Sequence, residues 1–459
     1  MKKNSSSSER VIEEVSSYIS RSAEAELPKE VIEKAKHHIL DTLSAIVSGS
    51  RLKPGKVAKE YAKNQLGVEE SQVVCSGILT SATNAALING IMAHADETDD
   101  HHLTSRTHPG CVIVPAALSM SQKEEADGLS FIKGVVAGYD ICCRIIQALG
   151  GMDTLSQLSR DTHAIGGSFG AAAAAAAIAR LKDDFVRYML SYTSQQASGI
   201  YYWARDDEHI EKAFVFGGMP ARNGVTAVTL VQSGFTGVRD PFSGEHNFFK
   251  AFSPNPYPEL LVEGLGSSYE IMLTSIKKFP VGGPIEPALD GLLTLIKKYN
   301  LTSRDIKSVV VRLPGVPARV VNERNMPNIN LQHILSVALM DGELTFESAH
   351  SHARMNEPAV LELRKHIKLL EDRGLENAQR HHQAIVEITT IDGSQLREHV
   401  VSVPGTVENP MTTKDIEIKC NGLLTPVLGE DRSKELIDTI LKLEQVKNMR
   451  DLWPLLSES

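Results

Sequence analysis

The chain has 459 residues, of which 42% are hydrophobic and 23% are charged, a balance typical of a globular protein and not of a disordered one. Its formal net charge of −9 at pH 7 offers no basic face to a polyanion, which argues against nucleic-acid binding. At this length we expect two or three structural units, with one large domain and one smaller domain as the default.

Cysteine usage and the apolar segments predict a cytoplasmic protein. The cysteines are odd in number and form no CxxC pair, so we interpret them as reduced core thiols. The start of the chain, MKKNSSSSER, lacks the apolar run of a secretory signal. The most apolar run, residues 166–179, has about fourteen residues against the roughly twenty that cross a bilayer, so we predict a buried helix and no membrane association. The cysteines are Cys75, Cys111, Cys142, Cys143 and Cys420.

From Glu9 to about Gly266 the chain has a helical pattern. Apolar residues recur at intervals of three and four in PKEVIEKAKHHILDTLSAIVSG, which ends at Gly49, and this spacing predicts one helix with a single apolar stripe. The unbroken alanine run at 171–177 favours a helix whose neighbours approach closely. Further helices are predicted at 81–95, 115–124, 130–148 and 167–181.

From about Ser268 the pattern changes to β-branched runs separated by helices. Strands are predicted within 268–280, 306–315 and 384–405, the last with an Asp-Gly turn, and helices at 284–299, 331–340 and 358–370. A helix at 434–447 then returns to the first pattern. We therefore predict a mainly α protein, with a large all-helical domain formed by residues 1–266 and 404–459 and a smaller α+β domain at 267–403.

The segment HADETDDHHLTSRTHPG, from His94 to Gly110, concentrates titratable side chains. It follows a predicted helix and ends at a proline and a glycine, so we expect a loop, where binding and catalytic groups are common. Three interpretations stay open. The segment forms a solvated acidic surface, or it holds a metal through residues 96–102, or it supplies histidines and carboxylates for general acid–base catalysis. Its spacing matches no metal motif of fixed ligand geometry.

Cationic residues beside glycine-rich backbone favour the acid–base interpretation. Lysine and arginine pair with carboxylates and stabilise a developing enolate, so these residues suit a di- or tricarboxylate ligand. His163 precedes a glycine-rich helix entry, where backbone N–H groups attract anions. Neither a Walker loop nor a dinucleotide fingerprint is present, which argues against ATP and NAD. The cationic candidates are Arg205, His209, Lys212 and Arg222 in one segment and Lys277 and Lys278 in another.

Several segments, in this order, resemble the MmgE/PrpD family. They are NGIMAHADETDDHHLTSRTHPGCVIVPAAL, THAIGGSFGAAAAAA, IEKAFVFGGMPARNGVTAVTLVQSGFTG, IKKFPVGGP and LSVALMDGELT. The family includes 2-methylcitrate dehydratase, cis-aconitate decarboxylase and iminodisuccinate epimerase. The resemblance implies a homodimer, a large all-helical domain with a smaller α+β lid, and proton chemistry next to a carboxylate without a cofactor or metal.

The resemblance also identifies site residues. The family's aspartate corresponds to Asp96, its histidine before proline to His108, its second histidine to His163, and its two lysines to Lys212 and Lys277. The Asp-x-Asp-Asp-Thr pattern of the family's decarboxylases has an added residue in this chain. His333 stands where the family often has a tyrosine. Further substrate-binding candidates are Asp100, His101, Arg222, Lys278 and His333.

We therefore expect a cofactor-independent lyase or isomerase that acts on a small di- or tricarboxylic acid, as a dehydratase or a decarboxylase. The five identified residues are expected to converge around that molecule. Alternatives are an epimerase of an imino- or hydroxy-dicarboxylate, a metal-dependent hydrolase or lyase, and a non-catalytic carboxylate-binding protein.

Overall fold

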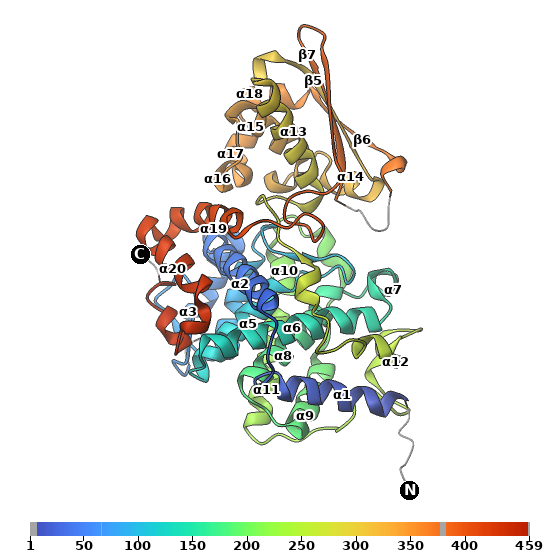
Figure 1. The fold of residues 1–459 in the computed structure, drawn as a ribbon, viewed down its shortest axis with the longest axis vertical. Helices are drawn as coiled ribbons and strands as arrows, with labels where there is room; N and C mark the ends of the chain where they lie inside the picture. The colour runs from blue at the N-terminus through green and yellow to red at the C-terminus, as the bar shows by residue number, and fades with distance from the viewer. Residues whose placement is uncertain (1–6, 66, 377–381, 458–459) are drawn as a thin grey trace. The chain divides into compact units, whose positions relative to one another are not determined.

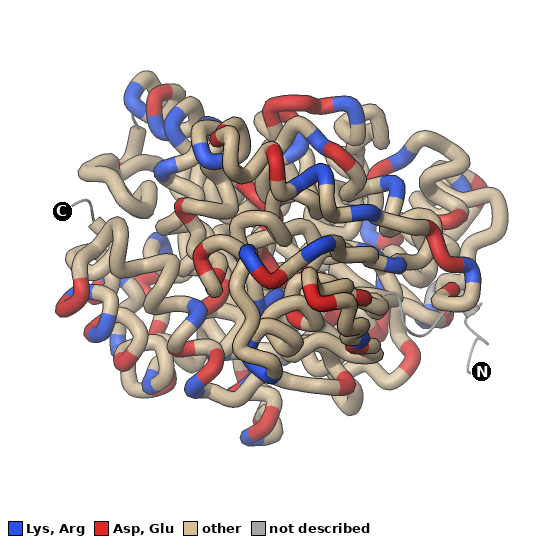
Figure 2. The backbone as a smooth tube through the Cα atoms, turned by 90° about the horizontal axis from the view of Figure 1, so that it is seen from above, with Lys and Arg blue, Asp and Glu red and all other residues tan. Residues whose placement is uncertain are grey.

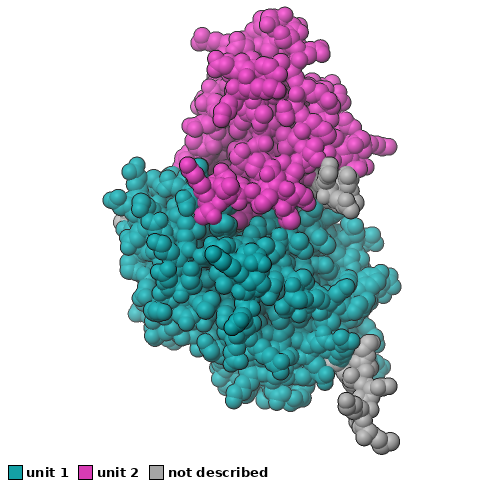
Figure 3. Space-filling model, in the orientation of Figure 1, with its two compact units in different colours: residues 1–95, 99–275, 416–459 teal, residues 96–98, 276–415 magenta. Residues whose placement is uncertain are grey.

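The computed structural model describes residues 7–65, 67–376 and 382–457 (Figure 1). The chain divides into two compact units, coloured separately in Figure 3. The helical unit comprises residues up to 95, 99–275 and 416–459, and the sheet unit comprises residues 96–98 and 276–415. The predicted boundaries lie after residues 266 and 403, whereas the structure has them after residues 275 and 415.

The helical unit consists of helices and two very short antiparallel strand pairs, β1 (Ser71–Gln72) with β2 (Leu79–Thr80) and β3 (His101–His102) with β4 (Thr274–Ser275). The predicted mainly α fold is confirmed. In chain order its helices include α1 (Ser7–Arg21), α2 (Lys29–Gly49), α3 (Lys53–Lys63), α4 (Ala82–Ala93), α5 (Gly110–Lys123), α6 (Gly128–Ala148), α7 (Gly151–Gln157), α8 (Thr162–Ile178), α9 (Asp183–Gln196), α10 (Ile210–Ala213), α11 (Met219–Gln232), α12 (Phe248–Phe252), α19 (Thr413–Leu428) and α20 (Glu430–Leu441).

The alanine-rich helix α8 lies in the core of this unit. Every residue of α8 is buried, and the helix packs against α5, α6, α9 and α11. Small side chains let these backbones approach closely. A Cβ atom added at Gly224 of α11 would lie 2.4 Å from the backbone nitrogen of Ala172 and 2.5 Å from the Cβ of Ala171. The predicted role of the alanine run in close helix packing is therefore visible at this crossing.

Gly224→Ala should destabilise the protein by about 1–3 kcal/mol, because a close-packed helix crossing cannot accept one extra methyl group without moving. Chemical denaturation should show the loss as a lower midpoint. The matched control is Gly422→Ala in α19, where a Cβ meets nothing within 4 Å. There the change should be neutral or stabilising by up to about 1 kcal/mol, because alanine is the better helix former. Equal effects at the two positions would contradict the packing argument.

Side-chain caps fix where several of these helices begin. Ser81 accepts a hydrogen bond from the backbone of Asn84 at the start of α4, and Asp161 accepts one from Ala164 at the start of α8. The start predicted for α5 was wrong by five residues, since the helix begins at Gly110 and continues through Pro115. A proline inside a helix removes one backbone hydrogen bond, and packing in this buried helix outweighs that cost.

The sheet unit contains a mixed four-stranded sheet of order β6-β5-β7-β8. Strands β5 (Ile306–Leu313) and β6 (Ile367–Glu371) are parallel, and β7 (Ala384–Thr390) is antiparallel to both β5 and β8 (Gln395–Val400). The predicted Asp-Gly turn connects β7 and β8, with Gly393 at a φ of 89°. Helix α13 (Glu286–Tyr299) packs on β7 and β8, and α15 (Leu331–Asp341) packs on β6 and α13. Their apolar side chains form the core of this unit.

One sequence prediction was wrong over its second half, and another was confirmed over two residues only. The helix predicted at 358–370 stops as α18 (Pro358–Arg364), and residues Ile367–Glu371 form strand β6 because they pair with β5. The strand predicted within 268–280 is a 3-10 turn at Glu270–Leu273 followed by the two residues of β4. At Ile367–Glu371, pairing with a distant strand decided the structure of a short apolar run.

The five cysteines are buried, and none of them forms a disulfide. Among the described residues, no helix combines the length and the apolar character that a membrane crossing requires. Acidic and basic residues are interspersed over the backbone (Figure 2).

Candidate active site

The titratable segment from His94 to Gly110 is a loop, as predicted, between the end of α4 and the start of α5. Asp100 holds the end of this loop. Its carboxylate accepts hydrogen bonds from the Gly110 backbone N–H at 2.9 Å and the Tyr139 hydroxyl at 2.6 Å, and it contacts His38 Nδ1 at 2.6 Å. Asp100, which the sequence predicts as a substrate contact, thus faces the protein's own groups. Its neighbour His101 lies with its ring centroid 6.4 Å from that of His108.

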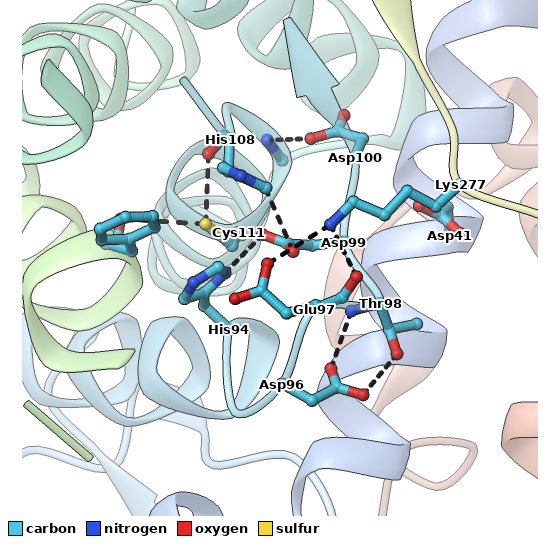
Figure 4. Close-up of polar contacts among 12 residues, drawn as sticks. Asp41, His94, Asp96, Glu97, Thr98, Asp99, Asp100, His108, Cys111 and Lys277 are labelled. Carbon is cyan, nitrogen blue, oxygen red and sulfur yellow. Dashed lines mark hydrogen bonds and ion pairs between the residues drawn. The ribbon is translucent and has the colours of Figure 1, made fainter. Parts of the chain in front are cut away.

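Asp99 lies between two imidazole rings (Figure 4). Its Oδ2 atom is 2.8 Å from His94 Nδ1, and its Oδ1 atom is 3.3 Å from His108 Nδ1. His94 and Asp99 are fully buried, whereas the His108 side chain is 16% exposed. Burial alone would raise the pKa of Asp99, but the two imidazoles outweigh it and hold this pKa well below its usual range. The carboxyl group is therefore ionised near neutral pH.

His163 has a carboxylate partner of its own in the first turn of α8. Its Nδ1 atom is 3.2 Å from Asp161 Oδ2. Asp161 is held in place by two donors, the Ala164 backbone N–H at 2.7 Å and the Trp203 indole N–H at 2.6 Å. The same aspartate thus caps α8 and orients an imidazole. His108 and His163 both meet their carboxylates through Nδ1, so each ring directs Nε2 away from its carboxylate.

A π-helical segment, Phe214–Gly218, brings the predicted catalytic residues of this unit together. The ring of Phe216 stacks on His163 at a centroid distance of 3.6 Å and on His94 at 4.5 Å. The His108 ring lies 5.3 Å from His163, and Lys212 Nζ lies 5.0 Å from the Phe216 centroid. We call His94, His108, His163, Lys212 and Phe216 the Phe216 cluster. Segments of π-helix are frequent at functional sites.

The backbone beside the cluster has a strained position at His209. This buried residue has a φ of 60° immediately before α10, a left-handed conformation that is uncommon for a residue other than glycine. Its ring lies 5.1 Å from the His94 ring. The strained residue thus lies beside other imidazoles. Backbone strain is common at functional sites.

Burial lowers the pKa of His163 below its usual value of 6.5. The Asp161 carboxylate opposes this shift, while the charge of Lys212 adds to it. A lowered pKa leaves the His163 imidazole neutral near pH 7, in the form that accepts a proton.

Lys212→Met should therefore raise the pKa of His163 toward 6.5, because a neighbouring positive charge that disfavours the imidazolium is lost. Asp161→Asn should lower it further, because the carboxylate that favours the imidazolium is lost. An NMR titration of the His163 ring protons measures both shifts. Shifts of the same sign in the two variants would contradict this electrostatic description.

The predicted residues Asp96 and Lys277 belong to the sheet unit, Asp96 as part of the turn at 96–98 and Lys277 in contact with that turn (Figure 4). The Asp96 carboxylate accepts hydrogen bonds from the backbone and the hydroxyl of Thr98 and lies 2.8 Å from His350 Nε2. Lys277 Nζ donates to the Glu97 carbonyl at 2.6 Å and lies 3.8 Å from Glu97 Oε2. Asp96 is thus engaged in its own turn, and Glu97 is the carboxylate beside Lys277.

Of three further predicted substrate contacts, two have partners within their own units and one is buried in its helix. Lys278 Nζ is 2.7 Å from Asp290, and the Arg222 guanidinium donates to Asn223 Oδ1 at 3.1 Å. His333 is fully buried in α15, and burial lowers its pKa to about 4. Their predicted contact with substrate stays a prediction.

The structure adds four residues that sequence reasoning did not select: His94, Glu97, Asp99 and Asp161. The first three belong to the titratable segment, whose carboxylates cannot be ranked by residue type or spacing. Asp161 carried a weak signal as a capping aspartate directly before a helix start. The five residues predicted to converge fall into two groups, with His108, His163 and Lys212 in the helical unit and Asp96 and Lys277 in the sheet unit.

Two groups of buried side chains in the helical unit carry atoms of the metal-ligand type. In each group the donor atoms lie within 4.8 Å of one another, and histidine, thiol and carboxylate are ligands that zinc accepts. The side chains of each group include one residue of the segment 96–102, which the sequence offered as a metal site. They are His94, Asp99 and Cys111 in one group and His102, Cys143 and Glu270 in the other.

Comparison with known proteins gives matches over nearly the whole chain. The profile of the MmgE/PrpD N-terminal domain matches residues 13–261, and that of the MmgE/PrpD C-terminal domain matches residues 279–445. A cis-aconitate decarboxylase of Aspergillus terreus is 26% identical over 97% of this chain and 96% of its own length. The cis-aconitate decarboxylase of Homo sapiens is 24% identical over 94% and 91%. The cis-aconitate decarboxylase-like protein oryM of Aspergillus oryzae is 23% identical over 97% of each chain.

Proposed function

Since this chain belongs to the MmgE/PrpD family, we propose that it is a cofactor-independent lyase that acts on a small di- or tricarboxylic acid by proton transfer next to a carboxylate. Decarboxylation is the first reaction to test, because the similar proteins carry the name cis-aconitate decarboxylase. Dehydration is the second, because it also requires an acid, a base and a cation.

The observation that carries this proposal is the Phe216 cluster. It places two imidazoles, each with a carboxylate at Nδ1, beside one lysine on an apolar ring. In decarboxylation, the carbon–carbon bond breaks, the electron pair stays on carbon, and an imidazolium delivers a proton there. In dehydration, a neutral imidazole removes a proton next to the carboxylate, a double bond forms, and the leaving hydroxide takes a proton from the other ring. Both reactions need one acid, one base and a cation for the transient negative charge.

The surroundings of the two histidines favour a division of roles. The lowered pKa of His163 suits the base, because the ring is neutral near pH 7. His108 suits the acid, because the Asp99 carboxylate at its Nδ1 stabilises the imidazolium. Lys212 would bind a substrate carboxylate and stabilise the enolate-like intermediate.

In this proposal, two residues of the sheet unit bind and orient the substrate. Lys277 would hold a substrate carboxylate, as the family resemblance implies. Its Nζ also contacts Glu97, so a carboxylate of the protein lies beside it. Asp96 would act as an orienting carboxylate, and the imidazole that it contacts is that of His350.

Purified protein should be incubated with cis-aconitate, citrate-like and aspartate-like dicarboxylic acids in heavy water, and the products should be followed by NMR. A decarboxylase yields an acid with one carbon fewer and with solvent deuterium at the carbon that lost carbon dioxide. A dehydratase yields an unsaturated acid, and an epimerase yields deuterium exchange with inversion. Activity should survive exhaustive chelation.

The non-catalytic alternative gives a different result in the same experiment. A carboxylate-binding protein should show a higher melting temperature with one of these acids, without exchange or conversion. That outcome would overturn the proposed function, and loss of activity on chelation would overturn its cofactor-independent form.

A further inference from the structure

We propose that Asp99 is a positioning residue that fixes His94 and His108 in the same tautomer, since its two carboxylate oxygens face the Nδ1 atoms of both rings. The geometric part of this proposal is independent of the reaction, whereas its effect on catalysis rests on the proposed function. Neither the family resemblance nor the sequence distinguished Asp99 from the other three carboxylates of the same loop.

The geometry allows one assignment of the protons. An ionised carboxylate accepts hydrogen bonds and donates none. Asp99 is fully buried, and each of its oxygens faces one imidazole nitrogen, His94 Nδ1 at 2.8 Å and His108 Nδ1 at 3.3 Å. The hydrogen bond between His94 Nδ1 and Oδ2 requires the hydrogen at that nitrogen, and we infer the same position in His108 from the 3.3 Å ion-pair contact of its Nδ1 with Oδ1. A neutral imidazole has only one N–H, so both rings hold their lone pair at Nε2.

Packing keeps these rings in the orientation that the carboxylate selects. His94 stacks on Phe216 with an interplanar angle of 22°, and His108 meets His94 edge to face at 5.2 Å. His94 Nε2 is buried and has no hydrogen-bond partner among the described residues. The pairing of His94 with Oδ2 stops the Asp99 carboxylate from rotating, so that Oδ1 stays directed at His108. His94 is in this sense a positioning residue for Asp99.

The neighbouring carboxylates have different tasks. Asp100 holds the backbone at Gly110, and Asp96 closes a turn with Thr98. Asp161 orients a single imidazole and also caps a helix. Asp99 is placed between two imidazoles, so its removal should alter proton positions more than backbone structure. An aspartate that fixes a tautomer acts through the imidazole and does not itself exchange a proton with substrate.

The test begins with the unmodified protein. Long-range ¹H–¹⁵N NMR on ¹⁵N-histidine-labelled protein reports which ring nitrogen of each histidine carries the hydrogen, with assignment by His94→Gln and His108→Gln. We expect Nδ1–H without Nε2–H in both rings at a pH where each ring is neutral. A neutral ring with its hydrogen at Nε2 would overturn the proposal, whatever reaction the protein catalyses and whether or not a variant folds.

Asp99→Asn supplies the second measurement. The asparagine amide has one acceptor and one donor end, so one of the two imidazoles must change to the Nε2–H form. If the proposed function holds, kcat should fall about 100-fold or more, the usual contribution of a positioned acid or base, while KM changes less than threefold. Asp99→Glu keeps the carboxylate and should recover the tautomer and part of kcat.

The matched control is Asp140→Asn, which changes another buried aspartate of the helical unit that bonds to Tyr18 and the Glu270 backbone and to no imidazole. It should leave the His94 and His108 tautomers unchanged. If both rings stay Nδ1–H in Asp99→Asn, the positioning role is wrong. If the tautomers change but no acid is converted even by the unmodified protein, the positioning role stands and the proposed function fails.

Discussion

His108→Gln should lower kcat by about 100- to 10,000-fold, the range that a positioned general acid or base contributes. Glutamine keeps a polar side chain of similar length but cannot carry a proton between pH 5 and 8. The fold should survive, because the His108 side chain is partly exposed and lies at the end of a loop, not within an apolar core. Steady-state kinetics on the acid that the protein converts, with circular dichroism and a melting curve for each variant, check both parts.

The control for this substitution is His246→Gln, which replaces an exposed histidine of the same unit. Its kcat should stay within twofold of the unmodified protein. Near-normal turnover in His108→Gln, with a folded protein, would remove His108 from the mechanism.

Lys212→Met should lower kcat by about 100- to 1000-fold, as is typical when one preorganised electrostatic contact to a transition state is lost. Methionine keeps an unbranched apolar stem over Phe216 and Trp203, where the lysine ammonium lies 5.0 and 5.3 Å from the ring centroids. The charge is thus removed with little change in packing. If Lys212 also binds a ground-state carboxylate, KM should rise as well.

Lys212→Arg tests whether charge alone suffices. Arginine keeps the positive charge but carries it on a planar fork, so partial recovery is expected. Lys182→Met, at an exposed lysine of the same unit, should leave both constants unchanged. An unaltered kcat in Lys212→Met would mean that the transient negative charge is stabilised elsewhere.

Much of the fold is predictable from the sequence because it depends on local patterns. Spacings of three and four residues located α2, α4 and α6 to within two residues, whereas α8 begins five residues before its predicted start and includes His163. The strand run before Asp392 and Gly393 identified the β7–β8 hairpin, because that turn chemistry acts between neighbours in the chain. The helix prediction failed at β6, where a partner distant in sequence, β5, decided the structure.

In the candidate site too, some features were predictable from the sequence and others depended on the tertiary structure. The sequence by itself determined that the chain carries histidines at 108 and 163, a lysine at 212 and an excess of carboxylates near residue 100, because these are properties of residue type and of family resemblance. Only the tertiary structure decided which carboxylate each imidazole meets, Asp99 for His108 and Asp161 for His163. It also stacked Phe216 on the His163 ring and brought the Lys212 ammonium over the Phe216 ring. The physical reason is that proton position depends on the direction and distance of a hydrogen-bond partner, and helix packing sets both.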